Sequence, residues 1–119
     1  MYVGRIVVVG RTDGGCWAGY RVSSRSFPNR KTVLRDRNVT VSPLNFQDMA
    51  KNPYIAYNCI RLVDDLAVAT NGTQTDMIAE KISDGMKPLD AIDLSLMAYG
   101  YERDELDTPR IAGVVSGDQ

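Results

Sequence analysis

The segment RVSSRSFPNRK, residues 21–31, carries four cationic side chains and no acidic one. The cations are Arg21, Arg25, Arg30 and Lys31. The planar guanidinium group of arginine binds two oxygens of a phosphate at once, and the hydroxyls of Ser23 and Ser24 add further donors. Two interpretations follow from these residues: a site for an anion such as a phosphate, or a solvated basic loop.

The net charge of the chain indicates what kind of anion this segment suits. With 14 basic and 15 acidic residues the formal charge is -1, so no broad attraction to a nucleic acid is expected. A single phosphate fits the local cluster better than a polyanion does. An RNA-binding module stays open as an alternative, because a basic segment is the feature on which such a module depends.

The 119-residue chain has no histidine, and its two cysteines, Cys16 and Cys59, stand at no spacing typical of metal ligands. We therefore expect two free thiols buried in apolar strands, and no zinc site. Without histidine, any proton transfer falls to carboxylate, tyrosine, lysine or cysteine side chains.

Residues 53–63 contain polar side chains within a strand-like pattern. In a strand, Tyr57 and Cys59 face one side and Asn58 faces the other. A buried asparagine in mid-strand must find hydrogen-bond partners. We favour the simpler interpretation for Asn58, which is an exposed strand edge.

Two further polar segments flank the expected helices. Asn71 lies where a strand ends and a helix begins, a junction whose free N–H groups favour anions, although Asn-Gly is also a common turn. The connector 101–110 carries four acids, Glu102, Asp104, Glu105 and Asp107. Such a run is normally solvated, and one of its carboxylates is functional only if the fold turns it inward.

The hydrophobic pattern predicts the elements that position these residues. β-branched runs bounded by turn residues predict five or six strands before any helix, at 2–10, 16–24, 31–36, 38–43, 53–63 and 66–72. The first strand, with IVVV at 6–9, is apolar enough to be covered on both faces. Residues 44–53 are expected to form a loop, and 111–115 a last strand.

Two helices are expected between the strands. The first begins at a capping box, residues 73–76, and ends at Gly85, and the second runs from Pro88 to Gly100. Their predicted core faces are Met77, Ile78, Ile82 and Met86, then Leu89, Ile92, Leu96 and Tyr99. Strands followed by two helices and a strand predict a single α+β domain, residues 1–119, with antiparallel sheet.

Five segments carry a resemblance to a known family: MYVGRIVVVGRT, YRVSSRSFPNR, PYIAYNC, VATNGTQTD and YERDELDTPRIAGVV. In this order, from Met1 to about Val115, they resemble the archaeal type of IMP cyclohydrolase. The resemblance implies an Ntn-hydrolase-like fold, an αββα sandwich of antiparallel sheets flanked by helices. It also implies closure of the purine ring, from 5-formamidoimidazole-4-carboxamide ribotide to IMP and water. Family members run further, so we expect a fold incomplete at the C-terminus, and an inactive fragment stays an alternative.

The resemblance also implies roles for single residues. Tyr57 and Glu102 are implied as catalytic, Tyr57 polarising or protonating the formyl oxygen and Glu102 acting as general base or acid. Substrate contacts are implied for Arg21, Ser23, Ser24, Arg25, Arg30, Asn58, Asn71 and Arg110. Arg21 and Arg30 are the first candidates for contacts to the phosphate or carboxamide, and Asn58 lines the base beside Tyr57.

The implied partner is a small-molecule purine ribotide, without nucleic acid, membrane, metal or cofactor, and the family's tendency to assemble implies a homo-oligomer. Met1-Tyr2 offers no N-terminal Cys, Ser or Thr, so no autoprocessing is expected. The apolar run 6–9 is far too short for export or for spanning a membrane, so we expect a cytoplasmic protein.

Overall fold

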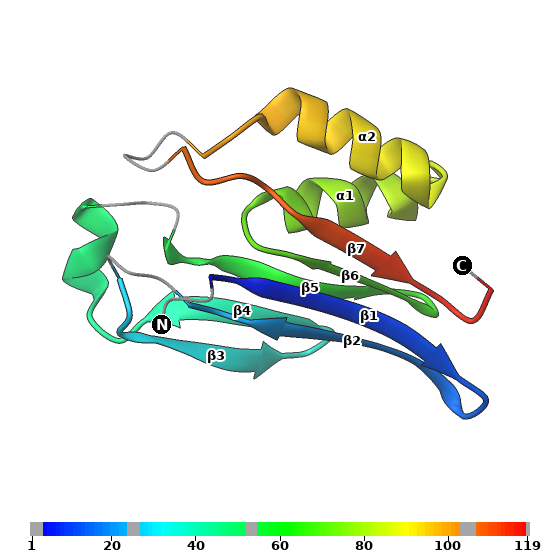
Figure 1. Cartoon of the computed structure of the whole chain (residues 1–119), viewed down its shortest axis with the longest axis horizontal. Coiled ribbons are helices and arrows are strands. Elements are labelled where there is room, and N and C mark those ends of the chain that lie inside the picture. Colours follow the sequence, from blue (N-terminus) through cyan, green and yellow to red (C-terminus); the bar gives the residue numbers. More distant parts are fainter. Residues whose placement is uncertain (1–3, 24–26, 52–54, 103–106, 119) are drawn as a thin grey trace.

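The structure, a computed structural model, describes residues 4–23, 27–51, 55–102 and 107–118 (Figure 1). Along the chain its elements are β1 (Ile6–Thr12), β2 (Gly15–Arg21), β3 (Arg30–Arg35), β4 (Asn38–Pro43), the 3-10 helix η1 (Phe46–Ala50), β5 (Tyr57–Val63), β6 (Leu66–Thr70), α1 (Gln74–Ser83), α2 (Pro88–Tyr99) and β7 (Ala112–Val115). The predicted order of strands and helices is confirmed. The predicted loop 44–53 was wrong in one respect, because it contains η1, whose first turn is capped by the Asn45 side chain.

The strands form two antiparallel sheets. β1 and β2 make a hairpin that closes at the pair Thr12 and Gly15. The other five strands form one sheet in the order β3-β4-β5-β6-β7, with every pair of neighbours antiparallel. Figure 1 shows the hairpin lying against one face of this sheet and both helices against the other. The predicted α+β class, with antiparallel sheets packed face to face, is confirmed.

Two apolar clusters hold these layers together. Between the helices and the large sheet, Val68, Ile78 and Ala91 are fully buried in one cluster with Leu66 and Ala79. Between the two sheets, a second cluster contains Val41, Tyr57 and Cys59, with Tyr20 and Val22 packed against it. Burial of these side chains supplies the main driving force for the layered arrangement.

The prediction that the first strand is covered on both faces is wrong for the described residues. Val7 and Val9 point toward β7, where they contact Gly113. On the opposite face of the hairpin, Val8 is 40% exposed and Trp17 is 48% exposed. Among the described residues, no element packs over this outer face, and the helical layer lies on the large sheet alone.

The two helices end as predicted but begin and pack differently. Gly85 and Gly100 follow α1 and α2 with φ of 102° and 62°, a conformation that glycine adopts without strain. The predicted capping box at 73–76 is wrong, because Thr73 makes no side-chain cap hydrogen bond. Instead the Thr75 hydroxyl donates to the carbonyl of Gly72 at 3.0 Å. The carboxylate of Asp76 is engaged elsewhere, by the sheet.

The predicted core face of α2 is partly wrong. Ile92 packs on the apolar cluster, but Leu89 is 69% exposed and Tyr99 is 39% exposed. The fully buried residues of α2 are the small ones, Ala91 and Ser95. The stripe of large apolar residues therefore does not mark the buried face of α2, because this helix packs on its neighbours through small side chains.

The hairpin packing gives a prediction for Gly10, which lies opposite Trp17 in the register of β1 and β2. A Cβ atom at Gly10 would lie 2.7 Å from Cε2 of the Trp17 indole. We expect Gly10→Ala to push this single tryptophan of the chain off β1 and to red-shift its fluorescence, because the indole becomes more exposed to water. The free energy of unfolding should change by no more than about 1 kcal/mol, since the indole can swing outward.

Gly19→Ala is the matched control, because a Cβ at Gly19 meets no atom within 4 Å. Its fluorescence should match that of the unmodified protein. Equal red shifts in both variants would contradict the observed packing of Trp17 on Gly10.

Candidate active site

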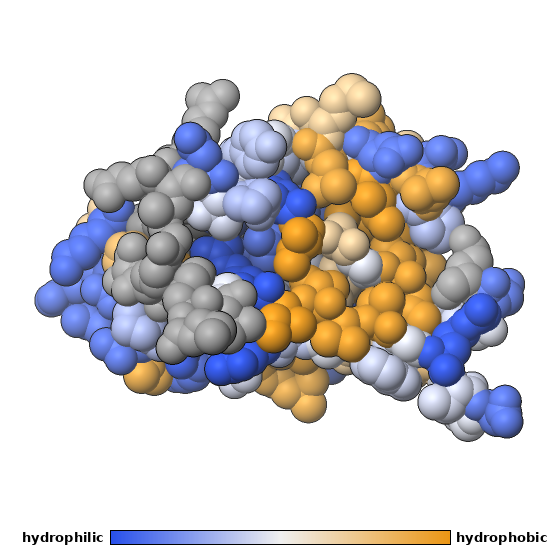
Figure 2. Space-filling view, in the orientation of Figure 1, coloured by the Kyte–Doolittle hydropathy of each residue, from blue (hydrophilic) through white to orange (hydrophobic). Residues whose placement is uncertain are grey.

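Polar side chains gather at one end of the sandwich. The odd-numbered strands begin at this end and the even-numbered strands finish there, because neighbours in each sheet are antiparallel. Figure 2 shows hydrophilic residues on this side and a largely hydrophobic surface over the other half of the same face. Strand ends thus bring together residues far apart in the sequence, namely Arg5, Tyr20, Arg30, Tyr57, Asn71 and Glu102.

Tyr20 and Tyr57 form a hydrogen-bonded pair between the two sheets. Alternation along β2 and β5 turns both rings inward, where they meet edge to face with ring centroids 6.3 Å apart. Their hydroxyl oxygens lie 2.5 Å apart. Tyr57 is 6% exposed, so this predicted catalytic side chain is buried and held by a neighbour that was not predicted.

Two arginines place positive charge beside this pair. Burial raises the pKa of Tyr57, whereas the hydrogen bond with Tyr20 and the charges of Arg5 and Arg30 act to lower it. Burial lowers the pKa of Arg30. For Arg5, burial acts to lower the pKa, but the neighbouring Tyr57 and Glu102 raise it overall. Two cations that act on one phenol can stabilise negative charge that develops at its hydroxyl or on a bound group.

Glu102 is turned inward, which is the condition that the sequence set for a functional carboxylate in the connector. Its side chain is fully buried, and Oε1 lies 3.3 Å from Nη1 of Arg5. The same Arg5 nitrogen donates to the carbonyl of Asn71 at 3.1 Å. Arg5 therefore links Glu102 to Asn71, and its charge also acts on Tyr57 and Tyr20. Asp107 is exposed, and Asp104 and Glu105 lie outside the described residues.

Asn71 and Arg110 are bound within the protein. The amide of Asn71 donates to the carbonyl of Pro109 at 2.9 Å and accepts from the N–H of Ile111 at 2.9 Å. Arg110 donates to Oε1 of Gln74 at 2.7 Å. Its Nε donates to the carbonyl of Gly100 at 2.8 Å. Both predicted contact residues thus fasten the start of β7 to the junction of β6 and α1.

Asn58 points away from Tyr57. It accepts a hydrogen bond from Thr40 at 2.7 Å and donates to Asp76 of α1 at 2.9 Å, on the helical side of the sheet. Asp76 also pairs with Arg61 at 3.4 Å. The predicted exposed edge is wrong, because β5 is the middle strand of five. Asn58 links the sheet to α1 and does not share a face with Tyr57.

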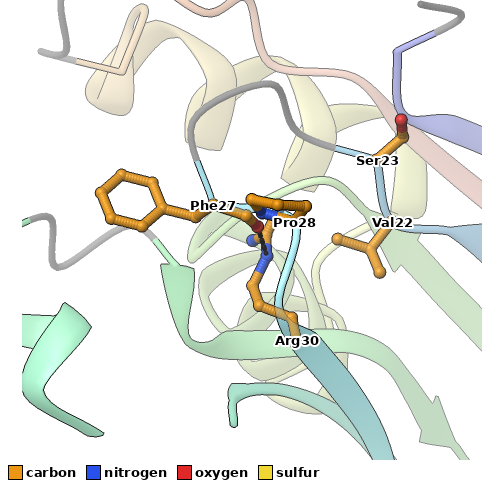
Figure 3. A pocket seen from close by; sticks show the side chains of 5 residues that line it. All are labelled: Val22, Ser23, Phe27, Pro28 and Arg30. Carbon is orange, nitrogen blue, oxygen red and sulfur yellow. Dashed lines mark hydrogen bonds between the residues drawn. The ribbon is translucent and has the colours of Figure 1, made fainter. Parts of the chain in front are cut away.

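The residues of the basic segment 21–31 do not all face the same place in the structure. Val22, Ser23, Phe27, Pro28 and Arg30 line a cavity of about 170 Å³. In Figure 3 the Arg30 side chain reaches up beneath Pro28, and the Ser23 hydroxyl points away from it. Nε of Arg30 donates to the carbonyl of Phe27 at 3.0 Å. Arg21 is exposed and sits next along β2 from the inward-facing Tyr20, hence on the opposite face. Ser24 and Arg25 lie outside the described residues.

Two residues of this end were missed by the sequence reasoning. Arg5 is an isolated cation immediately before an aliphatic strand, where a charge must be paired if it is buried. Tyr20 precedes the basic segment and follows the inward-facing Ala18 by two positions. Both signals were present in the sequence, but a partner had to be known before either could be assigned to the site.

Among the described residues, no three His, Cys, Asp or Glu side chains lie close enough to hold a metal ion. Both cysteines are free thiols, as predicted; Cys59 is buried, whereas Cys16 is only half-buried. Burial raises the pKa of Cys59 to about 11. No helix in the described part of the chain has the length and apolar character that crossing a membrane requires.

Gly72 gives a test of how closely this end is packed. A Cβ atom there would lie 2.6 Å from Oε1 of Gln74, 2.9 Å from Nη1 of Arg110 and 3.1 Å from Oε1 of Glu102. We expect Gly72→Ala to break this packing and to lower the free energy of unfolding by about 1–3 kcal/mol in a urea titration. Gly14→Ala, whose Cβ would meet no atom closer than 3.8 Å, is the control. An equal effect of the two changes would contradict the described packing.

Known proteins match the chain over nearly its whole length. A family model described as IMP cyclohydrolase-like protein matches residues 2–119. Among curated relatives, the IMP cyclohydrolase of Methanothrix thermoacetophila is 62% identical over 98% of this chain, and that of Methanocella arvoryzae is 59% identical over 98%. The IMP cyclohydrolase of Methanococcus maripaludis strain S2 is 52% identical over the full chain. The chain spans 59%, 58% and 60% of the length of these relatives.

These matches confirm the resemblance that the five sequence segments carry. The chain belongs to the IMP cyclohydrolase-like family.

Proposed function

We propose that the protein closes the purine ring, converting 5-formamidoimidazole-4-carboxamide ribotide to IMP and water. The observation that carries the proposal is that Arg5 pairs with the buried carboxylate of Glu102 at 3.3 Å while its charge also acts on the buried phenol of Tyr57. Two relatives of the chain are named IMP cyclohydrolase, which supports the proposal. The proposal concerns the activity of a whole protein, and the relatives are longer than this chain.

The reaction needs positioning and proton transfer. The carboxamide nitrogen forms a bond to the formyl carbon of the same molecule. One proton from that nitrogen and one from the formamido nitrogen leave with the formyl oxygen as water. Since both reacting groups belong to one substrate, the protein must hold a productive conformer, polarise the formyl oxygen and move these protons.

We assign the polarising role to Tyr57 and the proton-accepting role to Glu102. The Tyr57 hydroxyl donates a hydrogen bond to the formyl oxygen, and the charges of Arg5 and Arg30 stabilise the negative charge that grows there. Glu102 takes the proton from the carboxamide nitrogen and later returns it to the departing oxygen. Arg5 compensates the charge of the buried carboxylate at 3.3 Å.

We assign the ribotide phosphate to the cavity beside Arg30. Nη2 of Arg30 is buried without a hydrogen-bond partner among the described residues, so it has a donor for an incoming anion. Ser23 lies at the rim of the same cavity. Arg21, with Ser24 and Arg25, stays a predicted contact of the phosphate. Asn58, Asn71 and Arg110 are instead proposed to hold the walls of the site, because their side chains already bind other protein groups.

The RNA-binding alternative rests on the basic segment alone and is not favoured. Arg30 of that segment turns to protein carbonyls, those of Phe27 and Ile55, instead of presenting its guanidinium on an open surface. A cytoplasmic location, the absence of a nucleic-acid partner and assembly into a homo-oligomer stay predictions. Sedimentation of the purified protein tests the last of these.

Exchange of the carboxylate for its amide tests the assigned base. In protein expressed from the complete gene, Glu102→Gln should lower kcat for IMP formation from the formyl ribotide by about 100-fold or more, because general base catalysis is lost. Asp107→Asn is the matched control in the same connector. Asp107 is exposed and its φ of 46° is one that asparagine accepts.

Full activity of Glu102→Gln, or an equal loss of kcat in Asp107→Asn, would contradict the assignment of Glu102 as the general base. Absence of IMP formation above the spontaneous rate in the unmodified, folded protein would overturn the proposed function itself. An assay of the 119-residue chain by itself tests the alternative that it is an inactive fragment.

A further inference from the structure

The hydroxyls of Tyr20 and Tyr57 make a hydrogen bond in which the two partners have different roles. Each phenol has one proton to donate, and their oxygens lie 2.5 Å apart. One hydroxyl must therefore donate to the other, and the accepting hydroxyl keeps its own proton for a third group. Which tyrosine accepts decides which proton is available to a ligand.

The role proposed for Tyr57 decides which hydroxyl accepts. Burial raises the pKa of both tyrosines, so both hydroxyls keep their protons in the ligand-free protein. The charges of Arg5 and Arg30 act on both phenols, and each arginine interacts more strongly with Tyr57 than with Tyr20. Because Tyr57 is proposed to give its own proton to the substrate, the hydroxyl of Tyr20 must be the donor within the pair.

Packing also holds the Tyr20 ring in place. Tyr20 stands on β2 and Tyr57 on β5, so the pair crosses the interface between the two sheets. The rings meet edge to face at an interplanar angle of 73°, and both belong to the apolar cluster with Val22 and Val41. The hairpin therefore presents a rigid hydroxyl to the Tyr57 oxygen.

We propose that Tyr20 is a positioning residue for Tyr57: its hydroxyl donates to Oη of Tyr57 and leaves the Tyr57 proton for the formyl oxygen of the substrate. This inference rests on the proposed function. As negative charge grows on Oη of Tyr57 while it donates, the bond from Tyr20 strengthens. Tyr20 thus acts through Tyr57 and touches no reacting atom.

Tyr20→Phe tests the proposal, because it removes the hydroxyl and keeps the ring. We expect kcat to fall about tenfold with KM changed by less than about twofold, since the lost bond is strongest in the transition state. The alkaline limb of the pH–rate profile should move to higher pH, because a donor that favours ionised Tyr57 is gone. Tyr101→Phe, at a side chain that is 66% exposed, should leave all three quantities unchanged.

A second arm uses no substrate, so it separates this inference from the proposed function. The proton shared by Tyr20 and Tyr57 should give a downfield hydroxyl signal in the proton NMR spectrum of the ligand-free protein. That signal should vanish in both Tyr20→Phe and Tyr57→Phe and persist in Tyr101→Phe. If it persists in Tyr20→Phe, or if Tyr20→Phe raises KM alone, the inference is overturned. If the hydroxyl signal vanishes as stated but neither the unmodified protein nor any variant forms IMP, the hydrogen bond between Tyr20 and Tyr57 is supported and the proposed function is wrong.

Discussion

The buried ion pair of Arg5 and Glu102 is the constraint on which the active-site end depends. The Glu102 side chain is fully buried and that of Arg5 is 13% exposed. Neither charge is well solvated, so each needs the other as its partner. Removing one partner of such a pair typically costs about 3–5 kcal/mol, because the other charge is left uncompensated. The pair ties the segment before β1 to the connector before β7, which lie 97 positions apart.

From this pair the rest of the site extends in two directions. On one side, Arg5 approaches the tyrosine pair, which joins the hairpin to the middle strand of the large sheet. On the other, Arg5 donates to the carbonyl of Asn71, whose amide fixes the start of β7. The residues with proposed chemical roles therefore stand on strand ends that buried polar contacts hold in register. Polar groups on the helical side, such as Asn58 and Asp76, form a separate network that anchors α1 to the sheet.

The sequence predicted those features that depend on neighbouring residues. Strand order followed from short β-branched runs and turns, and the helix ends followed from Gly85 and Gly100, where glycine accepts a positive φ. Strand alternation also separated Tyr57 from Asn58 correctly. The family resemblance, from five ordered segments, named Glu102 and Tyr57, but it did not give their partners.

Features that depend on distant residues were predicted poorly. Thr73 to Asp76 has the form of a capping box, yet Asp76 binds Asn58 and Arg61 of β5, which local spacing cannot reveal. Leu89 looked like core because of its period, but α2 packs through Ala91 and Ser95. Arg21 and Arg30 looked equivalent, and only strand register separates an outward arginine from one that lines a cavity. Tyr20 and Arg5 needed a known partner before they could be recognised.

The proposed function requires that this end of the sandwich binds the purine ribotide. A crystal structure of the protein with IMP bound tests it most directly. We expect the hypoxanthine ring against the Tyr57 hydroxyl and the Glu102 carboxylate, with the phosphate in the cavity beside Arg30. IMP bound elsewhere, with neither Tyr57 nor Glu102 in contact with its base, would contradict it.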